Sequence, residues 1–201
     1  MHSRLLIVSA AVLVVAACSS DDPAISMDGA RSATPPNAST CPLHLDPPAA
    51  LKAAGVGTAV TPDSISVQKS KTGKPADDPI AAQRGGMSAI DAIAGVYVAC
   101  DYKAASGSFD VTVVITPVKG AASVLGPVLV RDAGLSLTEA RPLLESPPGA
   151  GEVRIVGETV AFGGIAVDGG DGAILVHSEL PDVHDETLAN VTKTLTGQLR
   201  N

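Results

Sequence analysis

Residues 95–116 read GVYVACDYKAASGSFDVTVVIT, and this stretch decides the fold. Apolar side chains alternate with polar or small ones over 96–102, and they alternate again over 109–115. A period of two is typical of a strand that buries one face. The segment between the two halves ends in Gly107, which favours a short turn. The sequence therefore predicts a β-hairpin whose buried face includes Cys100.

The segments before the hairpin predict one helix, one strand and one loop. LDPPAALKAAGVG (45–57) has Asp46 as a candidate N-cap and Pro47 at the first helical position, so it predicts a short helix. SISVQKS (64–70) alternates in polarity and predicts an edge strand. Residues 69–88 are polar and predict a long mobile loop.

The segments after the hairpin predict helices and then strands. GAASVLGPVLVRDAG (120–134) predicts a helix that its central Gly-Pro pair interrupts, and SLTEARPLLES (136–146) begins with a capping-box pattern. VRIVGETVAFGGIAV (153–167) and GAILVHSEL (172–180) predict two or three more strands.

The C-terminal residues 184–199 predict an amphipathic helix. Leu188, Val191, Leu195 and Leu199 lie on one helical stripe, which suits packing on a sheet. The predicted fold class is therefore α+β. It has an antiparallel sheet of about five or six strands, with a short N-terminal helix, middle helices and the C-terminal helix packed on it.

The first residues of the chain predict export. Arg4 precedes an eleven-residue, largely apolar segment, Leu5–Val15. This segment is too short to span about 30 Å of hydrocarbon as a helix. A basic start, a short apolar core and small residues at its exit are typical of a secretory signal. We therefore expect residues 1–17 to be a signal peptide.

Val15-Ala16-Ala17-Cys18 resembles the lipobox of bacterial lipoproteins, in which an aliphatic residue and two small residues precede a cysteine. The resemblance implies cleavage before Cys18, a diacylglycerol on its sulfur, and a place on the extracytoplasmic face of the cell membrane. Residues 19–40 lack apolar periodicity and are rich in Ser, Asp, Ala and Pro. We expect residues 18–40 to be the lipidated cysteine and a disordered tether, and residues 41–201 to be a single domain.

Two further cysteines remain once Cys18 is assigned to the lipid. In an oxidising compartment Cys41 and Cys100 favour a disulfide. It would close a loop of about 60 residues, which is worth about 4 kcal/mol in the chain-entropy model. The alternatives are two free buried thiols or two metal ligands, but neither cysteine has a second Cys or a His at ligand spacing, and His44 is the only histidine close to either.

Charge and composition restrict the partners. The chain has 21 acidic and 14 basic residues and a net charge of −7. This balance argues against nucleic-acid binding, and against a surface that binds anionic lipids by itself. Aromatic residues are scarce and Trp is absent, so sugar platforms and base-stacking grooves lose support.

Motifs of the common enzymes are missing from the sequence. There is no G-x-S-x-G, complete Walker loop, G-x-G-x-x-G or H-E-x-x-H, and no cofactor is indicated. His177, His184 and Glu186, with Asp182 and Asp185, form the one local cluster that could hold a metal or act as acid and base. They are weak metal candidates because no metal motif has this spacing, and the helix dipole already explains acids in a first turn.

The layout as a whole resembles actinobacterial envelope lipoproteins of unknown function. The shared features are a leader, a Ser/Pro tether, a cysteine soon after it, a second cysteine in a strand and a C-terminal helix. Some members of that group carry lipids or bind proteins. We therefore expect a membrane-anchored, non-enzymatic binding module for an envelope protein or an apolar or lipid ligand. The alternative is an envelope hydrolase or metal-dependent enzyme that uses the region of His177 and His184, and a passive surface protein is a third possibility.

Overall fold

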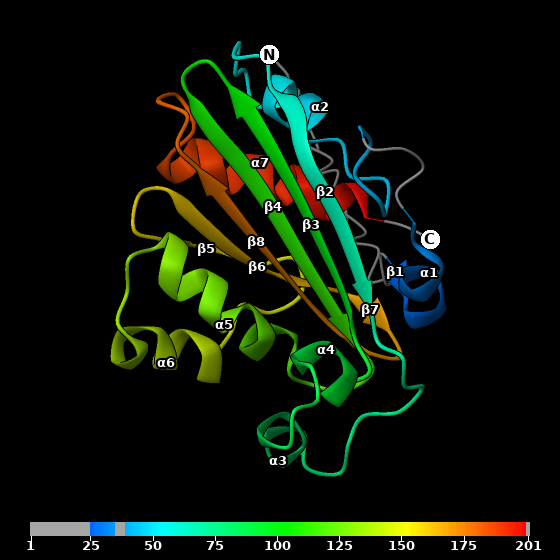
Figure 1. Cartoon of the computed structure of the whole chain (residues 1–201). Coiled ribbons are helices and arrows are strands. Elements are labelled where there is room, and N and C mark those ends of the chain that lie inside the picture. Colours follow the sequence, from blue (N-terminus) through cyan, green and yellow to red (C-terminus); the bar gives the residue numbers. More distant parts are fainter. Residues whose placement is uncertain (1–24, 35–38, 200–201) are drawn as a thin grey trace, which may run out of the picture.

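The computed structural model describes residues 25–34 and 39–199, and this part of the chain forms seven helices and two sheets (Figure 1). The helices are α1 (Met27–Ser32), α2 (Pro47–Ala53), α3 (Pro79–Arg84), α4 (Ala89–Ala92), α5 (Ala121–Asp132), α6 (Leu137–Glu145) and α7 (Asp185–Gln198). The strands are β1 (Ile25–Ser26), β2 (Thr61–Lys69), β3 (Val96–Ala104), β4 (Gly107–Thr116), β5 (Val153–Val156), β6 (Val160–Ile165), β7 (Val167–Asp168) and β8 (Asp171–Ser178).

The main sheet has six strands in the order β2-β3-β4-β8-β6-β5, and all of its neighbours are antiparallel. β1 and β7 form a separate two-stranded parallel sheet. The predicted α+β class is confirmed, with the C-terminal helix in place. Residues 153–180 contain four strands, because the two-residue β7 follows β6 directly.

The predicted hairpin is formed by β3 and β4. Val98 pairs with Val113 and Cys100 pairs with Val111, and all four side chains are buried. Gly107 begins β4 at φ +152°, and a Cβ there would lie 2.7 Å from the carbonyl oxygen of Glu179. Only glycine therefore permits this turn beside the end of β8.

Each face of the sheet packs against helices. On the inner face, Val113 and its alternate neighbours belong to the core cluster that includes Leu188 and Leu195 of α7. On the outer face, Val114 belongs to a second cluster with Leu125 of α5. Adjacent residues of a strand point to opposite faces, so the single step from Val113 to Val114 separates the two cores.

The helices around the sheet begin where the sequence predicts. The Asp46 carboxylate accepts a hydrogen bond from the amide of Ala49 at the start of α2, and α6 begins with a complete capping box. α5 continues through its Gly-Pro pair instead of breaking there. Gly126 has a packing role, because a Cβ at this position would lie 3.0 Å from Cδ1 of Leu144 in α6.

The long mobile loop predicted for residues 69–88 is wrong in part, because the segment contains α3 and is followed by α4. Side-chain caps begin both helices: Asp78 accepts from the amide of Ala81, and Ser88 accepts from the amide of Asp91. Helices this short have too few turns to show a helical repeat of apolar residues in the sequence.

The disordered tether predicted for residues 18–40 is also wrong where the structure describes it. Residues 25–34 form β1 and α1, and Ile25 is fully buried where it pairs with Val167. The pairing partner lies far along the chain, so no local pattern predicts it. The signal peptide 1–17, the lipidation at Cys18 and the rest of the tether up to residue 24 lie outside the described residues, as do residues 35–38.

Candidate functional site

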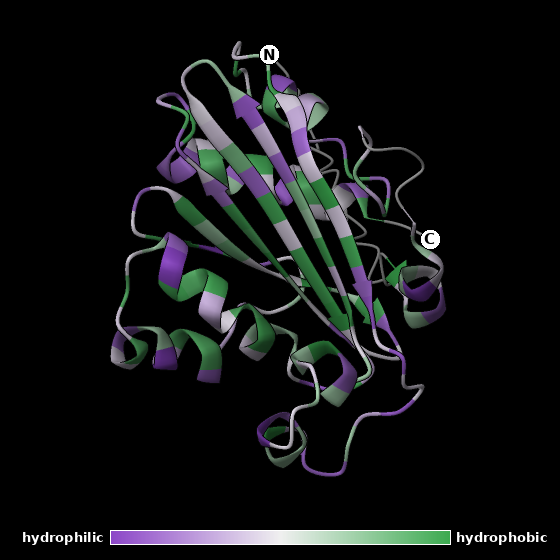
Figure 2. Ribbon diagram, in the orientation of Figure 1, coloured by the Kyte–Doolittle hydropathy of each residue, from purple (hydrophilic) through white to green (hydrophobic). Residues whose placement is uncertain are grey.

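A row of polar side chains crosses the outer face of the main sheet. The register places Asp101 of β3 opposite Asp110 of β4, and Asp110 opposite His177 of β8. On the other side of Asp101, Ser64 of the edge strand β2 completes the row. The two acids alternate with the buried residues of the hairpin, which directs them to the outer face, and Figure 2 shows this alternation as bands of hydropathy along the strands.

His177 and Asp110 are bonded side chain to side chain. Nδ1 of His177 lies 3.3 Å from Oδ2 of Asp110, and the two side chains are 16% and 28% exposed. The hydrogen bond to Asp110 raises the pKa of His177, and partial burial opposes this rise. The protonated imidazole is therefore favoured in the folded protein, as expected for a histidine beside a carboxylate.

Asp101 lies in a less favourable environment. Burial raises its pKa first, and the negative charge of Asp110 adds to the rise, whereas a hydrogen bond with Ser64 lowers it. Like charges directly opposite one another on neighbouring strands are destabilising.

The two acids of this row, together with the C-terminal end of α5, line an open pocket of about 390 Å³. Arg131 donates from Nε and Nη2 to the carboxylate of Asp132, at 2.6 and 3.2 Å. Both residues line the pocket; the Arg131 side chain is 73% exposed and the Asp132 side chain 8%. The pocket is lined by Tyr97, Ala99, Asp101, Asp110, Thr112, Arg131 and Asp132.

The chemistry of the pocket suits a cationic group. Three carboxylates line it, of which Asp132 is paired with Arg131 and Asp110 with His177. Asp101 is the carboxylate of the lining that forms no ion pair among the described residues. The described part of the chain contains no group of three or more His, Cys, Asp or Glu side chains placed to hold a metal ion. The hydroxyl of Ser108 donates to Asp110 at 3.3 Å, so its proton goes to the carboxylate and not to the imidazole. This differs from the serine–histidine bond that activates a nucleophile.

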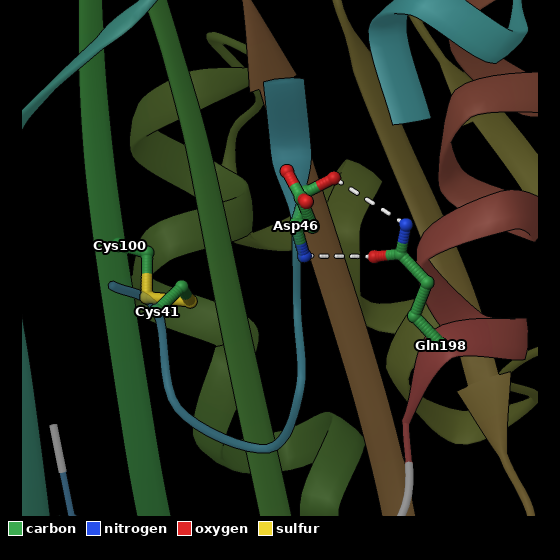
Figure 3. Close-up of a disulfide and its surroundings, with 4 residues drawn as sticks. All are labelled: Cys41, Asp46, Cys100 and Gln198. Atoms are coloured by element: carbon green, nitrogen blue, oxygen red, sulfur yellow. Dashed lines mark hydrogen bonds between the residues drawn. A yellow bond between two sulfur atoms is a disulfide. The ribbon is translucent and has the colours of Figure 1, made fainter. Parts of the chain in front are cut away.

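A second hollow, of about 610 Å³, is lined in part by Cys41, Asp46 and Gln198. Figure 3 shows these residues and the disulfide beside it. Cys41 and Cys100 are bonded to each other with their Cα atoms 5.8 Å apart, which confirms the predicted pairing. The amide of Asp46 donates to Oε1 of Gln198 at 2.8 Å, and Nε2 of Gln198 donates back to the Asp46 carbonyl at 3.4 Å. Burial raises the pKa of Tyr102 at this hollow to about 12. These contacts tie the segment before α2 to β3 and α7.

The other predicted site residues do not join the row. His184 precedes α7, and its Nδ1 lies 3.1 Å from Oδ2 of the adjacent Asp185. Both side chains are more than half exposed. Glu186 is exposed in the first turn of the same helix. The partner of His177 comes from β4 instead, so His177 and His184 bond to different carboxylates.

Sequence reasoning missed Asp101, Asp110, Arg131 and Asp132. The two acids of the hairpin carried a usable signal, since both occupy the face opposite the apolar stripe of a predicted strand. Their meeting with His177 depends on the pairing of β4 with β8, which lie far apart in the sequence.

Known proteins provide no relative from which a role for this pocket could be inferred. No protein-family model matches the chain, and no curated protein or solved structure matches it. Within the described ranges, every helix is too short or too polar to cross a membrane.

Proposed function

We propose that this chain is an exported lipoprotein, held on the extracytoplasmic face of the cell membrane through Cys18, whose domain is a non-enzymatic binding module for an envelope protein. The pocket on the outer face of the sheet is the binding site in this proposal. The group that it receives is a lysine or arginine side chain of the partner.

Two features support the location. The lipobox-like Val15–Cys18 carries the anchor, because its aliphatic and small residues precede a cysteine directly after a short apolar core. The disulfide between Cys41 and Cys100 agrees with export, because such bonds persist in oxidising compartments and are rare in the cytosol.

One observation carries the binding proposal: Asp101 and Asp110 face each other at a pocket that the end of α5 also lines. The pair is unfavourable for folding, because one half-buried carboxylate lies next to the charge of another. A cation from a partner would relieve this repulsion by forming charge-assisted hydrogen bonds to both acids. Binding energy would then come from a feature that costs stability in the free protein.

A protein partner is favoured over an apolar ligand. A lipid carrier needs an enclosed apolar cavity. The space between the main sheet and α7 is instead occupied by fully buried side chains, among them Phe109, Ile174 and Leu195. The two hollows described above are open to solvent, and the pocket of the polar row is lined largely by charged groups.

Site-specific photo-cross-linking in living cells tests the binding site. A photoreactive amino acid replaces Ser66, which lies on the outer face opposite Ala99, and in a matched control it replaces Lys193 on α7. We expect a defined cross-linked partner from position 66 only, and its loss when Asp101→Asn and Asp110→Asn are combined. Cross-links that survive the double substitution, or that form equally from position 193, would contradict the proposal.

Mass spectrometry of the membrane fraction tests the anchor separately. We expect the chain to begin at Cys18 with a diacylglycerol on its sulfur, and the Cys18→Ala variant to lose this modification and accumulate as an uncleaved precursor. An unmodified Cys18, or a mature chain that begins at Met1, would refute the anchor without bearing on the pocket.

A further inference from the structure

The N-terminal segment joins the domain at one end of the main sheet. Ile25 is fully buried against β7, and the guanidinium of Arg31 donates to the carbonyls of Gly73 and Ala94 at 3.3 and 3.5 Å. Figure 1 shows β1, α1 and β7 beside the end of the sheet that α3 and α4 occupy. We call this end, formed by residues 25–33, 69–95, 116–120 and 167–171, the α3–α4 end.

Exposed apolar side chains gather at the α3–α4 end. Among the described residues, four large apolar side chains are strongly exposed, and three of them belong to this end: Ile80 at 63%, Met87 at 40% and Val118 at 48%. The fourth, Leu137, lies in α6. Single exposed apolar residues are ordinary, but several at one end, flanked by basic residues, indicate a contact surface.

The charge of the molecule is unevenly distributed along the same axis. The α3–α4 end has six basic and six acidic residues, so the net charge of −7 belongs to the rest of the chain. Asp78, Asp91 and Asp171 accept hydrogen bonds from backbone amides of this end. Four bases of this end are exposed (Lys71, Lys74, Arg84 and Lys119), and so are four acids (Asp28, Asp77, Asp78 and Asp168). The exposed charge of this end is therefore balanced, whereas the rest of the chain is acidic.

The length of chain before Ile25 limits where a lipid on Cys18 can be. Seven residue steps separate the two positions, and a fully extended chain covers at most about 25 Å over that distance. The nine residues of β3 alone extend about 30 Å toward the opposite end of the sheet. An anchored domain therefore has its α3–α4 end nearest the bilayer.

We propose that the α3–α4 end lies on the surface of the phospholipid bilayer, an inference that rests on the lipid anchor of the proposed function. Ile80, Met87 and Val118 enter the headgroup layer, and the exposed lysines beside them contact lipid phosphates. Basic side chains near apolar ones suit this interface, because their stems lie along apolar groups while their charges reach the phosphates. The contact is weak by itself, but the covalent lipid holds the α3–α4 end close to the bilayer, where the effective concentration of headgroups is high.

This orientation gives the acidic pocket a defined place. Asp101 and Asp110 lie in the halves of β3 and β4 next to the turn at Gly107, away from α3 and α4. The strongly acidic part of the domain then points away from anionic lipids and toward partners in the envelope.

Native lysines serve as the probes of this surface. The full chain is purified from membranes, the lipid on Cys18 is verified by mass spectrometry, and the protein is placed in phosphatidylcholine–phosphatidylglycerol vesicles or in nonionic detergent. A brief pulse of a water-soluble amine-reactive ester follows. We expect labelling of Lys71, Lys74 and Lys119 to slow several-fold in vesicles relative to detergent, with Lys52 and Lys193 unchanged.

Substitutions then test the apolar contacts. Ile80→Asp with Met87→Asp should restore fast labelling of Lys71 and Lys74 in vesicles, whereas Leu137→Asp, the matched control in α6, should not. Equal labelling rates in vesicles and detergent, or equal protection of Lys52 and Lys193, would refute the proposed contact between the α3–α4 end and the bilayer. Neither result would bear on the lipid anchor at Cys18. A chain that carries no lipid on Cys18 would overturn the anchor, and with it this surface, before any labelling is done.

Discussion

At the residue scale, Asp101 makes the clearest case that the outer face is built for more than folding. Its side chain is held opposite Asp110, and both burial and that neighbouring charge raise its pKa. Asp101→Asn keeps the shape and can keep the hydrogen bond with Ser64 while removing the repulsion. We expect the variant to be more stable at neutral pH by about 0.2–1 kcal/mol, the range for a cross-strand charge pair. Urea unfolding checks this, with the exposed Asp182→Asn as a control for lost charge.

The same variant links stability to binding. A carboxylate with a raised pKa in the folded state disfavours folding once the pH is above that pKa, so the gain from Asp101→Asn should fade as the pH falls and the acid is protonated. If Asp101→Asn destabilises the protein at pH 7, the carboxylate has a structural role and the argument for a strained binding site fails.

His177 should give stability with the opposite dependence on pH. The hydrogen bond to Asp110 raises its folded-state pKa above the ordinary value of 6.5. Its contribution is therefore fully present below about pH 6.5, and it is lost as the pH rises through the higher folded-state value. We expect His177→Gln to cost up to about 1 kcal/mol at pH 5.5, because the bond is long and partly exposed, and less at pH 8.5.

Urea unfolding at the two pH values measures this difference. His184→Gln is the matched control, because His184 also lies beside an aspartate but its side chain is 57% exposed. A cost for His177→Gln that is the same at both pH values would show that the pairing with Asp110 carries no proton-linked stability.

The contrast between these two histidines shows what sequence can say about a site. Both residues stand out in the sequence near a group of acids, but the nearby acids belong to the first turn of α7. The acid that bonds to His177 is 67 positions away and arrives through strand pairing. A long-range register decides which side chains meet, and local patterns carry no information about it.

At the element scale, predictions were best where a local rule and a tertiary contact agree. The hairpin, α2 and α6 each combine an apolar pattern with a cap or a turn residue, α7 combines one with acids in its first turn, and all four are present. α5 does not follow the local prediction of a break at its Gly-Pro pair, because Gly126 lies within the helix where Leu144 of α6 packs closely against it. The segment around α3 differs because short capped helices have no apolar face to recognise.

The disulfide fastens one of these elements, and its removal has a predictable cost. It joins residues 59 positions apart and connects the segment before α2 to the centre of β3. We expect Cys41→Ala with Cys100→Ala to lower the free energy of unfolding by about 4 kcal/mol, the chain-entropy value for a loop of this length. Urea unfolding with and without a thiol reductant measures it: reductant should lower the midpoint of the wild type and leave the double variant unchanged. A wild type indifferent to reductant would contradict the bond.

At the scale of the whole molecule, the boundary of the domain is the main difference between sequence and structure. A stretch rich in Ser, Asp, Ala and Pro predicts disorder from composition. Two apolar residues are enough to order residues 25–34, because Ile25 and Met27 both enter the inner core beside β7. Composition averages over a segment, whereas a single buried side chain contributes about 1.5–3 kcal/mol at one position.

This difference yields a test of where the domain begins. A chain that starts at Ser39 lacks β1 and α1, whereas one that starts at Ser19 keeps them. Burial of Ile25 and Met27 outweighs the cost of ordering a short segment, so we expect the shorter chain to be less stable by about 2 kcal/mol. Ile25→Ala in the longer chain should cost no more than the truncation, because the segment can detach once its main contact is lost. Urea unfolding of all three proteins checks this order. Identical midpoints for the two chain lengths would mean that residues 25–34 act as the tether that composition predicts, and the anchor would then hold no particular end of the domain toward the membrane.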